Sequence, residues 1–249
     1  MNFVILTQQL HAAHINLLKG ELARLPEIKK LKRYNHGSVH YVYGYGDRYS
    51  KETTERGAKC KEIYERRQKL QDELDVYLNA WHAAYKDEVP LIEPHMVKRT
   101  FAGGILLDRR YFDAAKENVN SRYPDGRKYC YDGIYYRSKS ESEIAKLYRE
   151  LGFETKYETE LYFNGYTVYP DFLVYVPEVG GCFYHEHFGG LSEAKYVKDA
   201  QIKMSNYLAM GLLDGIDIIY TCERSDVPFC SDSTVADITA LVMRRLALP

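Results

Sequence analysis

The sequence has little that would mark a disulfide-bonded, zinc-binding or membrane-spanning protein. Its 249 residues contain five cysteines, an odd number, and no two of them form a CxxC pair. Neither a disulfide framework nor a zinc knuckle is therefore expected. No apolar run reaches the roughly 18 residues that a membrane span needs. The first twenty residues lack a cationic leader with a small-residue cleavage site. We therefore expect a cytoplasmic protein without a membrane partner.

A strong net charge of either sign is also lacking. The chain has 34 Lys and Arg against 35 Asp and Glu, a formal net charge of -1. Such a chain has no global field that attracts a polyanion, so any nucleic-acid contact must come from a local patch. Residues 19–69 form the one region with a basic bias. The residues expected to contact nucleic acid there are Lys29, Lys30, Lys32, Arg33, Arg66 and Arg67. A solvated helix face with internal ion pairs is the alternative, and this N-terminal region could also mediate homo-oligomer or protein contacts.

Tyrosine, by contrast, is abundant. The chain has 24 tyrosines, and several alternate with other residues, as Tyr41, Tyr43 and Tyr45 do. Tyrosine combines a large apolar ring with a polar tip, which suits half-buried strands. A few of these rings could instead stack on unpaired bases.

The first half of the chain predicts a mainly helical region that carries a β-hairpin. The turn residues of the hairpin are Asn35, His36 and Gly37, and alternating apolar residues follow them. The spacing of apolar residues predicts helices over residues 5–25, 50–86 and 104–120. We place a domain boundary after residue 122, which gives an N-terminal region 1–122 and a second domain 123–249.

The second domain alternates between helix and strand patterns. Asn164-Gly165 is a strong hairpin signal between two strand-like runs. The predicted elements are a helix over 140–151, strands over 156–163, 166–176 and 182–186, a helix over 192–211, a strand over 217–221 and a helix over 234–246. This order predicts an α/β fold in which helices flank a mixed β-sheet.

Acidic residues occur where neighbouring strands of this sheet begin or end. Asp171 follows Pro170 at the start of one strand, and Glu186 ends the next. Two carboxylates on adjacent strands suit a divalent cation, because hard cations prefer oxygen ligands. Glu141, from the preceding helix, could add a third carboxylate, and we prefer it to Glu143. Glu141 could equally be an acidic residue that stabilises a first helical turn.

These residues stand in segments that resemble a known superfamily. RSKSE (residues 137–141), YPDF (169–172) and YHEHFG (184–189) resemble the PD-(D/E)xK nucleases over residues 129–221. The resemblance implies a restriction-endonuclease-like core and metal-dependent hydrolysis of phosphodiester bonds, with DNA as the expected substrate. It also implies that Asp171 and Glu186 bind Mg²⁺ or Mn²⁺ together with the backbone carbonyl of His187. Glu141 would complete the acidic cluster directly or through water.

The sequence departs from the superfamily pattern at the lysine. Phe188 stands where the motif has lysine, and Phe cannot orient water or stabilise a phosphorane. Lys203 is the natural substitute, since it lies four residues before Tyr207 and the two side chains share a helix face. The related Q-x-x-x-Y motif lies on this helix, so we give Lys203 the water-orienting or transition-state role and Tyr207 a supporting one. Lys195 and Lys198 lie near the helix start and are weaker candidates.

Two histidines flank Glu186, which suggests a His-Glu-His metal site. On a strand, however, His185 and His187 point away from the face that carries Glu186, so the three side chains cannot converge on one ion. His187 is more plausible as a supporting residue or a phosphate contact, with simple packing as the alternative.

Two functions follow from these patterns. The first is a metal-dependent nuclease, with cleavage of DNA or RNA and endo- or exonuclease action left open. The second is a catalytically inactive protein of the nuclease fold that binds nucleic acid or a protein partner as an adaptor, since Phe188 replaces the motif lysine.

Overall fold

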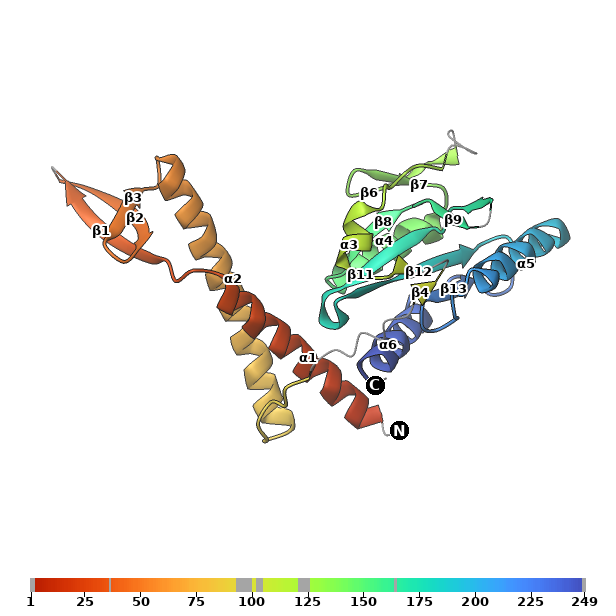
Figure 1. Ribbon diagram of the computed structural model, residues 1–249, viewed down its shortest axis with the longest axis horizontal. Helices are drawn as coiled ribbons and strands as arrows, with labels where there is room; N and C mark the ends of the chain where they lie inside the picture. The colour runs from red at the N-terminus through yellow and green to blue at the C-terminus, as the bar shows by residue number, and fades with distance from the viewer. Residues whose placement is uncertain are drawn as a thin grey trace. The chain divides into compact units, whose positions relative to one another are not determined.

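The computed structural model divides the chain into two compact units, Met1–Glu93 and Pro94–Pro249. It describes residues 3–35, 37–92, 100–101, 105–120, 126–163 and 165–247. The boundary expected after residue 122 lies within the second unit, in a segment (121–125) outside the described residues. Among the described helices, none is long and apolar enough to cross a membrane. Figure 1 shows the helices and strands of both units.

Two antiparallel helices form the body of the first unit. Helix α1 (Phe3–Arg24) packs against α2 (Glu55–Ala84) through a core of apolar side chains. The buried members of this core are Ala12, Ile15, Leu18, Leu22, Leu74 and Trp81. Both predicted helices are confirmed, but the second begins five residues later than expected. Thr54 caps α2 by accepting a hydrogen bond from the Gly57 amide at 3.1 Å, so the helix cannot extend further back.

The predicted hairpin is confirmed within a three-stranded antiparallel sheet. Strands β1 (Lys29–Asn35) and β2 (Ser38–Tyr45) form the hairpin, and β3 (Arg48–Lys51) pairs with β2. His36 in the turn lies outside the described residues. Near the base of the hairpin, Tyr43 is buried with Cys60 of α2. Farther out, the hairpin extends away from α2 (Figure 1).

A four-stranded mixed sheet forms the centre of the second unit. Its strands are ordered β13-β12-β11-β8, and only the β12–β13 pair is parallel. The strands are β8 (Glu154–Tyr157), β11 (Phe172–Val176), β12 (Gly181–Phe188) and β13 (Ile218–Cys222). The helices around it are α3 (Arg109–Ala114), α4 (Lys139–Glu150), α5 (Ala194–Ala209) and α6 (Ser231–Ala247). The predicted mixed α/β architecture is confirmed.

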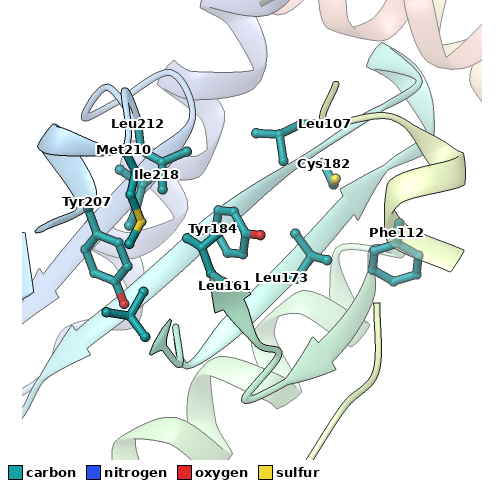
Figure 2. Close-up of a cluster of buried hydrophobic side chains, with 11 residues drawn as sticks. Leu107, Phe112, Leu161, Leu173, Cys182, Tyr184, Tyr207, Met210, Leu212 and Ile218 are labelled. Atoms are coloured by element: carbon teal, nitrogen blue, oxygen red, sulfur yellow. The ribbon is translucent and has the colours of Figure 1, made fainter. Parts of the chain in front are cut away.

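The two faces of this sheet carry different helices, because side chains alternate along each strand. On one face, Tyr148 of α4 packs against Phe172 and Phe183. On the other, Tyr207 of α5 and Phe112 of α3 join the cluster that contains Tyr184. Figure 2 shows Tyr184 between Tyr207 at one end of this cluster and Phe112 at the other. This second face also carries Glu186, two residues after Tyr184.

Smaller elements complete the unit. They are β4 (Thr100–Phe101), β5 (Ile105–Leu106), β6 (Tyr129–Tyr131), β7 (Ile134–Tyr136), β9 (Leu161–Phe163), β10 (Tyr166–Val168) and a 3₁₀ turn, η2 (Pro177–Val179). The pairs β4–β5, β6–β7 and β9–β10 each form a two-stranded antiparallel sheet. The hairpin predicted at Asn164-Gly165 is confirmed as β9–β10, although Asn164 itself lies outside the described residues.

Three of the predicted elements are wrong in extent. The helix expected over 104–120 is only the six-residue α3, because the chain turns extended at Ala115 (ψ 130°) and the Asn118 amide then bonds the Tyr157 carbonyl at 2.7 Å. The strands expected over 156–163 and 166–176 are each broken, so that β8 and β11 belong to the central sheet and β9–β10 stand apart. Glu158, with a left-handed φ of 49°, breaks the first of them.

We predict that Leu173→Ala destabilises the second unit. Leu173 is fully buried in β11, and removing its side chain should lower the free energy of unfolding by about 2–5 kcal/mol through lost burial and a residual cavity. Urea unfolding followed by far-UV circular dichroism measures this. Leu208→Ala on α5 is the matched control, since Leu208 is 64% exposed. Equal effects of the two substitutions would contradict the described core.

Candidate active site

Asp171 and Glu186 come together where β11 begins and β12 ends. Phe172 pairs with His185 in the antiparallel register, so Asp171 lies across from Glu186. Asp171 is half-buried and Glu186 is only 3% exposed. The His187 amide donates to Asp171 Oδ2 at 2.7 Å, which fixes one carboxylate oxygen. The structure thus brings together the two carboxylates that the sequence singled out.

Lys203 and Tyr207 of α5 reach this pair from the helix that covers the same face. The Lys203 ammonium donates to Glu186 Oε1 and, at 3.0 Å, to the carbonyl oxygen of Tyr169. The Tyr207 hydroxyl donates to Glu186 Oε2 at 2.7 Å. The four-residue spacing places both side chains on one turn of the helix face, as predicted. Phe188, at the usual lysine position, is buried and stacks near Tyr220.

Glu141 reaches the site from the first turn of α4. Ser138 caps this helix by accepting from the Glu141 amide at 3.1 Å, and Glu141 Oε2 in turn accepts from the Arg137 amide at 3.0 Å. This reciprocal arrangement resembles a capping box. The Tyr157 hydroxyl also donates to Glu141 Oε2. Glu141 therefore has a structural role in the helix start, and within the described chain its Oε1 accepts no hydrogen bond.

The electrostatics of the cluster are those of crowded, poorly solvated carboxylates. Burial, followed by the charge of Glu186 and then that of Glu141, raises the pKa of Asp171 well above its ordinary value, although Lys203 opposes the shift. Burial by itself would lower the pKa of Lys203, but Glu186 and Asp171 outweigh burial and raise it. Lys203 is therefore an ammonium ion at neutral pH and cannot act as a base.

The two histidines lie on the opposite face of β12, as the strand alternation predicts. His185 is fully buried between the Tyr148 hydroxyl at 2.7 Å and the Thr221 hydroxyl at 2.8 Å. The Thr221 oxygen also lies 2.9 Å from His187 Nδ1. Burial lowers the pKa of His185 to about 3 and also lowers that of His187. Both rings are neutral at pH 7 and support the β12–β13 pair, and neither presents a charge to a phosphate.

The donor atoms at this site fit a divalent cation in charge and chemistry. Asp171, Glu186 and Glu141 offer only hard oxygen atoms, and their mutual repulsion is what a bound cation would relieve. The His187 amide points toward Asp171, and a strand residue directs its amide and carbonyl to the same side, so the His187 carbonyl lies on that side too. In the described residues, however, no three His, Cys, Asp or Glu side chains already converge on an ion-sized point.

Some of the other predicted residues make contacts within the first unit, and the rest are exposed. Arg67 donates to the carbonyls of Leu22 and Leu25 at 2.7 and 2.6 Å, so it ties the end of α1 to α2. Arg66 lies 3.4 Å from Glu21 in an exposed ion pair. The four basic residues of β1 are exposed, as are Glu143, Lys195 and Lys198. Of the six predicted contact residues, the four of β1 are therefore exposed, Arg66 is exposed but paired with Glu21, and Arg67 is held by backbone carbonyls.

Several residues at the site were not foreseen from the sequence. Besides Tyr157 and the Tyr169 carbonyl, Glu158 lies buried beside the cluster and pairs with Arg127 and Arg137. These contacts join residues far apart in the chain, so no local spacing could have shown them. Pro170 was the one local signal, because a proline restricts the residue before it, here Tyr169, to an extended conformation.

A cavity of about 710 Å³ opens beside Lys203. Arg137, Tyr169, Lys203 and Asn206 line it together with residues of β10. Comparison of the chain with protein families, with curated proteins and with solved structures finds no match.

The raised pKa of Asp171 predicts a pH-dependent stability difference. An acid whose pKa is higher in the folded state binds more protons there, so wild-type stability falls as pH rises from about 4 toward that pKa. Asp171→Asn keeps an oxygen for the His187 amide and removes the titration. In metal-free buffer, the variant should therefore gain stability relative to wild type as pH rises. Urea unfolding at a series of pH values tests this, and a pH-independent difference would contradict it.

Proposed function

We propose that the second unit is a metal-dependent nuclease of the PD-(D/E)xK type, with a restriction-endonuclease-like core and Mg²⁺ or Mn²⁺ as cofactor. The observation that carries the proposal is the position of Lys203. Its ammonium group lies on Glu186 and beside Asp171, although it comes from α5 rather than from β12. A displaced lysine thus reaches the carboxylate pair at which the motif lysine would act. DNA is the proposed substrate.

The residues divide the work of phosphodiester hydrolysis between them. Asp171, Glu186 and the His187 carbonyl would hold the cation, with Glu141 completing the set directly or through water. When bound, the cation supplies charge neutralisation at the phosphate and lowers the pKa of the attacking water. Lys203 remains protonated, so its role is to orient that water or to stabilise the negative charge that develops on the phosphate. Tyr207 keeps Glu186 in place.

The surroundings of Lys203 can admit a nucleotide. The adjacent cavity of about 710 Å³ falls within the range typical of small-ligand sites. It contains cationic and amide side chains, Arg137, Lys203 and Asn206, that can contact phosphate or base. Arg137 also pairs with Glu158, which orients the guanidinium.

One observation favours a second candidate, the inactive adaptor. Both oxygens of Glu186 are already satisfied, one by Lys203 and one by Tyr207. A lysine that permanently replaces the cation would leave a stable fold without turnover. In that case the second unit would bind nucleic acid or a protein without cleaving it.

Metal binding separates the two candidates without reference to activity. For the nuclease, Mg²⁺ at 100 times its dissociation constant should stabilise wild type by about 2.7 kcal/mol. Glu186→Gln should lose this stabilisation. Lys203→Met should strengthen it, because the competing ammonium is gone. Thermal unfolding with increasing Mg²⁺ measures all three, and an absence of any shift in wild type and Lys203→Met would favour the adaptor.

Cleavage itself is tested with isosteric variants. Asp171→Asn and Glu186→Gln should abolish Mg²⁺-dependent cleavage of labelled DNA, since each removes a charge that holds the cation. Lys203→Met should lower the turnover rate by about 10²–10³-fold, as the loss of one transition-state donor does elsewhere. Lys198→Met on the exposed side of the same helix is the matched control. Retained cleavage in both carboxylate variants would refute the proposed site.

A further inference from the structure

The β1–β2 hairpin of the first unit carries a concentrated positive charge. Residues 28–46 contain no Asp or Glu, while β1 alone contributes four basic side chains. The chain as a whole has a net charge of -1, so this field is local to the hairpin. All four basic side chains are exposed.

The register of the hairpin sorts these side chains onto two faces. Lys32 lies opposite Tyr41 and Tyr34 lies opposite Val39, so these pairs share a face with Lys30. Lys29 and Arg33, at alternate positions of β1, point to the other face. We name the first set the tyrosine–lysine face. It consists of Lys30, Lys32, Tyr34, Val39 and Tyr41.

Aromatic rings and ammonium groups are interleaved on the tyrosine–lysine face. Lys30 Nζ lies 4.4 Å from the ring centroid of Tyr41, and Lys32 Nζ lies 5.3 Å from that of Tyr34. Tyr34 is nevertheless 72% exposed and Tyr41 38% exposed. Such cation–π contacts hold long lysine side chains close to the rings.

The base of the hairpin packs against α2, whereas the tyrosine–lysine face farther out is exposed. Tyr43, the next residue along the same face, is 2% exposed and packs edge-on against Tyr64 of α2 at 5.7 Å between ring centroids. The same alternation of tyrosines thus continues from the core onto an exposed surface. Burial against α2 accounts for Tyr43 but does not account for Tyr34 and Tyr41.

We infer that the tyrosine–lysine face binds single-stranded nucleic acid. Unpaired bases can stack on the two exposed rings, and the two lysines can contact the phosphates beside them. A duplex hides the faces of its bases and could use only the charges. An acidic protein segment could pair with the lysines but has no flat base to stack on the tyrosine rings. Of these occupants, a single strand alone matches both the charge and the aromatic surface.

This site is independent of the carboxylate cluster in the second unit. It goes beyond the proposed nuclease function, because binding would persist if the second unit cleaved nothing. It also narrows the basic region recognised from the sequence, since Arg67 is committed to α1 and Arg66 pairs with Glu21.

The test measures binding of the full chain to a fluorescent oligo(dT) by anisotropy. Every protein in the assay carries Asp171→Asn, and the buffer contains a chelator, so that cleavage cannot interfere. Tyr34→Leu and Tyr41→Leu should each weaken binding about fivefold or more, as the loss of one stacked base does. Tyr34→Phe and Tyr41→Phe should retain binding, because the rings remain.

The lysines are tested through salt dependence. Removing two single-strand phosphate contacts lowers the slope of log affinity against log salt concentration by about 1.4. Between about 50 and 200 mM salt, the affinity of Lys30→Gln/Lys32→Gln should therefore fall by a factor about sevenfold smaller than that of wild type. Lys29→Gln/Arg33→Gln, which removes the same charge from the other face, is the matched control and should alter the slope less. Circular dichroism checks that each variant is folded.

Three results would overturn the inference. They are wild-type affinity in the folded Tyr→Leu variants, equal effects of the two charge-pair variants, and tighter binding of a duplex or of a polyglutamate peptide than of oligo(dT). Since none of these measurements involves cleavage, they leave the proposed nuclease activity to be judged separately.

Discussion

The placement of one ammonium group beside two carboxylates, Glu186 and Asp171, is the constraint on which the second unit depends. Asp171, Glu186 and Glu141 would repel one another strongly in a poorly solvated site. Lys203 opposes this repulsion at Glu186 and Asp171. Each carboxylate also accepts a hydrogen bond from a neighbouring element: Asp171 from the His187 amide, Glu141 from the Tyr157 hydroxyl and Glu186 from the Tyr207 hydroxyl. The β11–β12 register, the start of α4 and the position of α5 all serve this arrangement.

The arrangement lowers the stability of the cation-free protein but suits the proposed binding of a cation. Burial and like charges raise the pKa of Asp171, which means that its ionised form costs folding free energy at neutral pH. A bound cation would recover that cost. The same residues also have ordinary structural roles, as the capping contacts of Glu141 show. The buried cluster therefore differs from an exposed surface ion pair, which contributes little to stability.

Local chemistry made much of the site predictable. The Pro-Asp at a strand start, the alternation around Glu186 and the four-residue spacing of Lys203 and Tyr207 each depend on residues close in sequence. The Asn-Gly hairpin was predictable for the same reason. The network around Glu158 was not, because its partners Arg127 and Arg137 are distant in the sequence and meet it only after folding.

The errors in the predicted elements have similar causes. The apolar pattern over 104–120 has helical spacing, but tertiary pairing of Asn118 with the Tyr157 carbonyl draws the chain into an extended path after Ala115. Periodicity likewise could not show that Glu158 adopts a left-handed conformation. In the first unit, exposure and cation–π contacts separate the tyrosines of β1–β2 into buried and accessible ones, a distinction that their spacing alone does not make.

We have proposed that Asp171 and Glu186, which lie beside Lys203, bind a cation. A crystal of the wild-type protein soaked in Mn²⁺ tests it most directly, because anomalous scattering locates the ion without any assumption about activity. We expect a Mn²⁺ peak in contact with Asp171, Glu186 and the His187 carbonyl, with the Lys203 ammonium moved off Glu186. A fully soaked crystal with no peak there, in which Lys203 still binds Glu186, would contradict it.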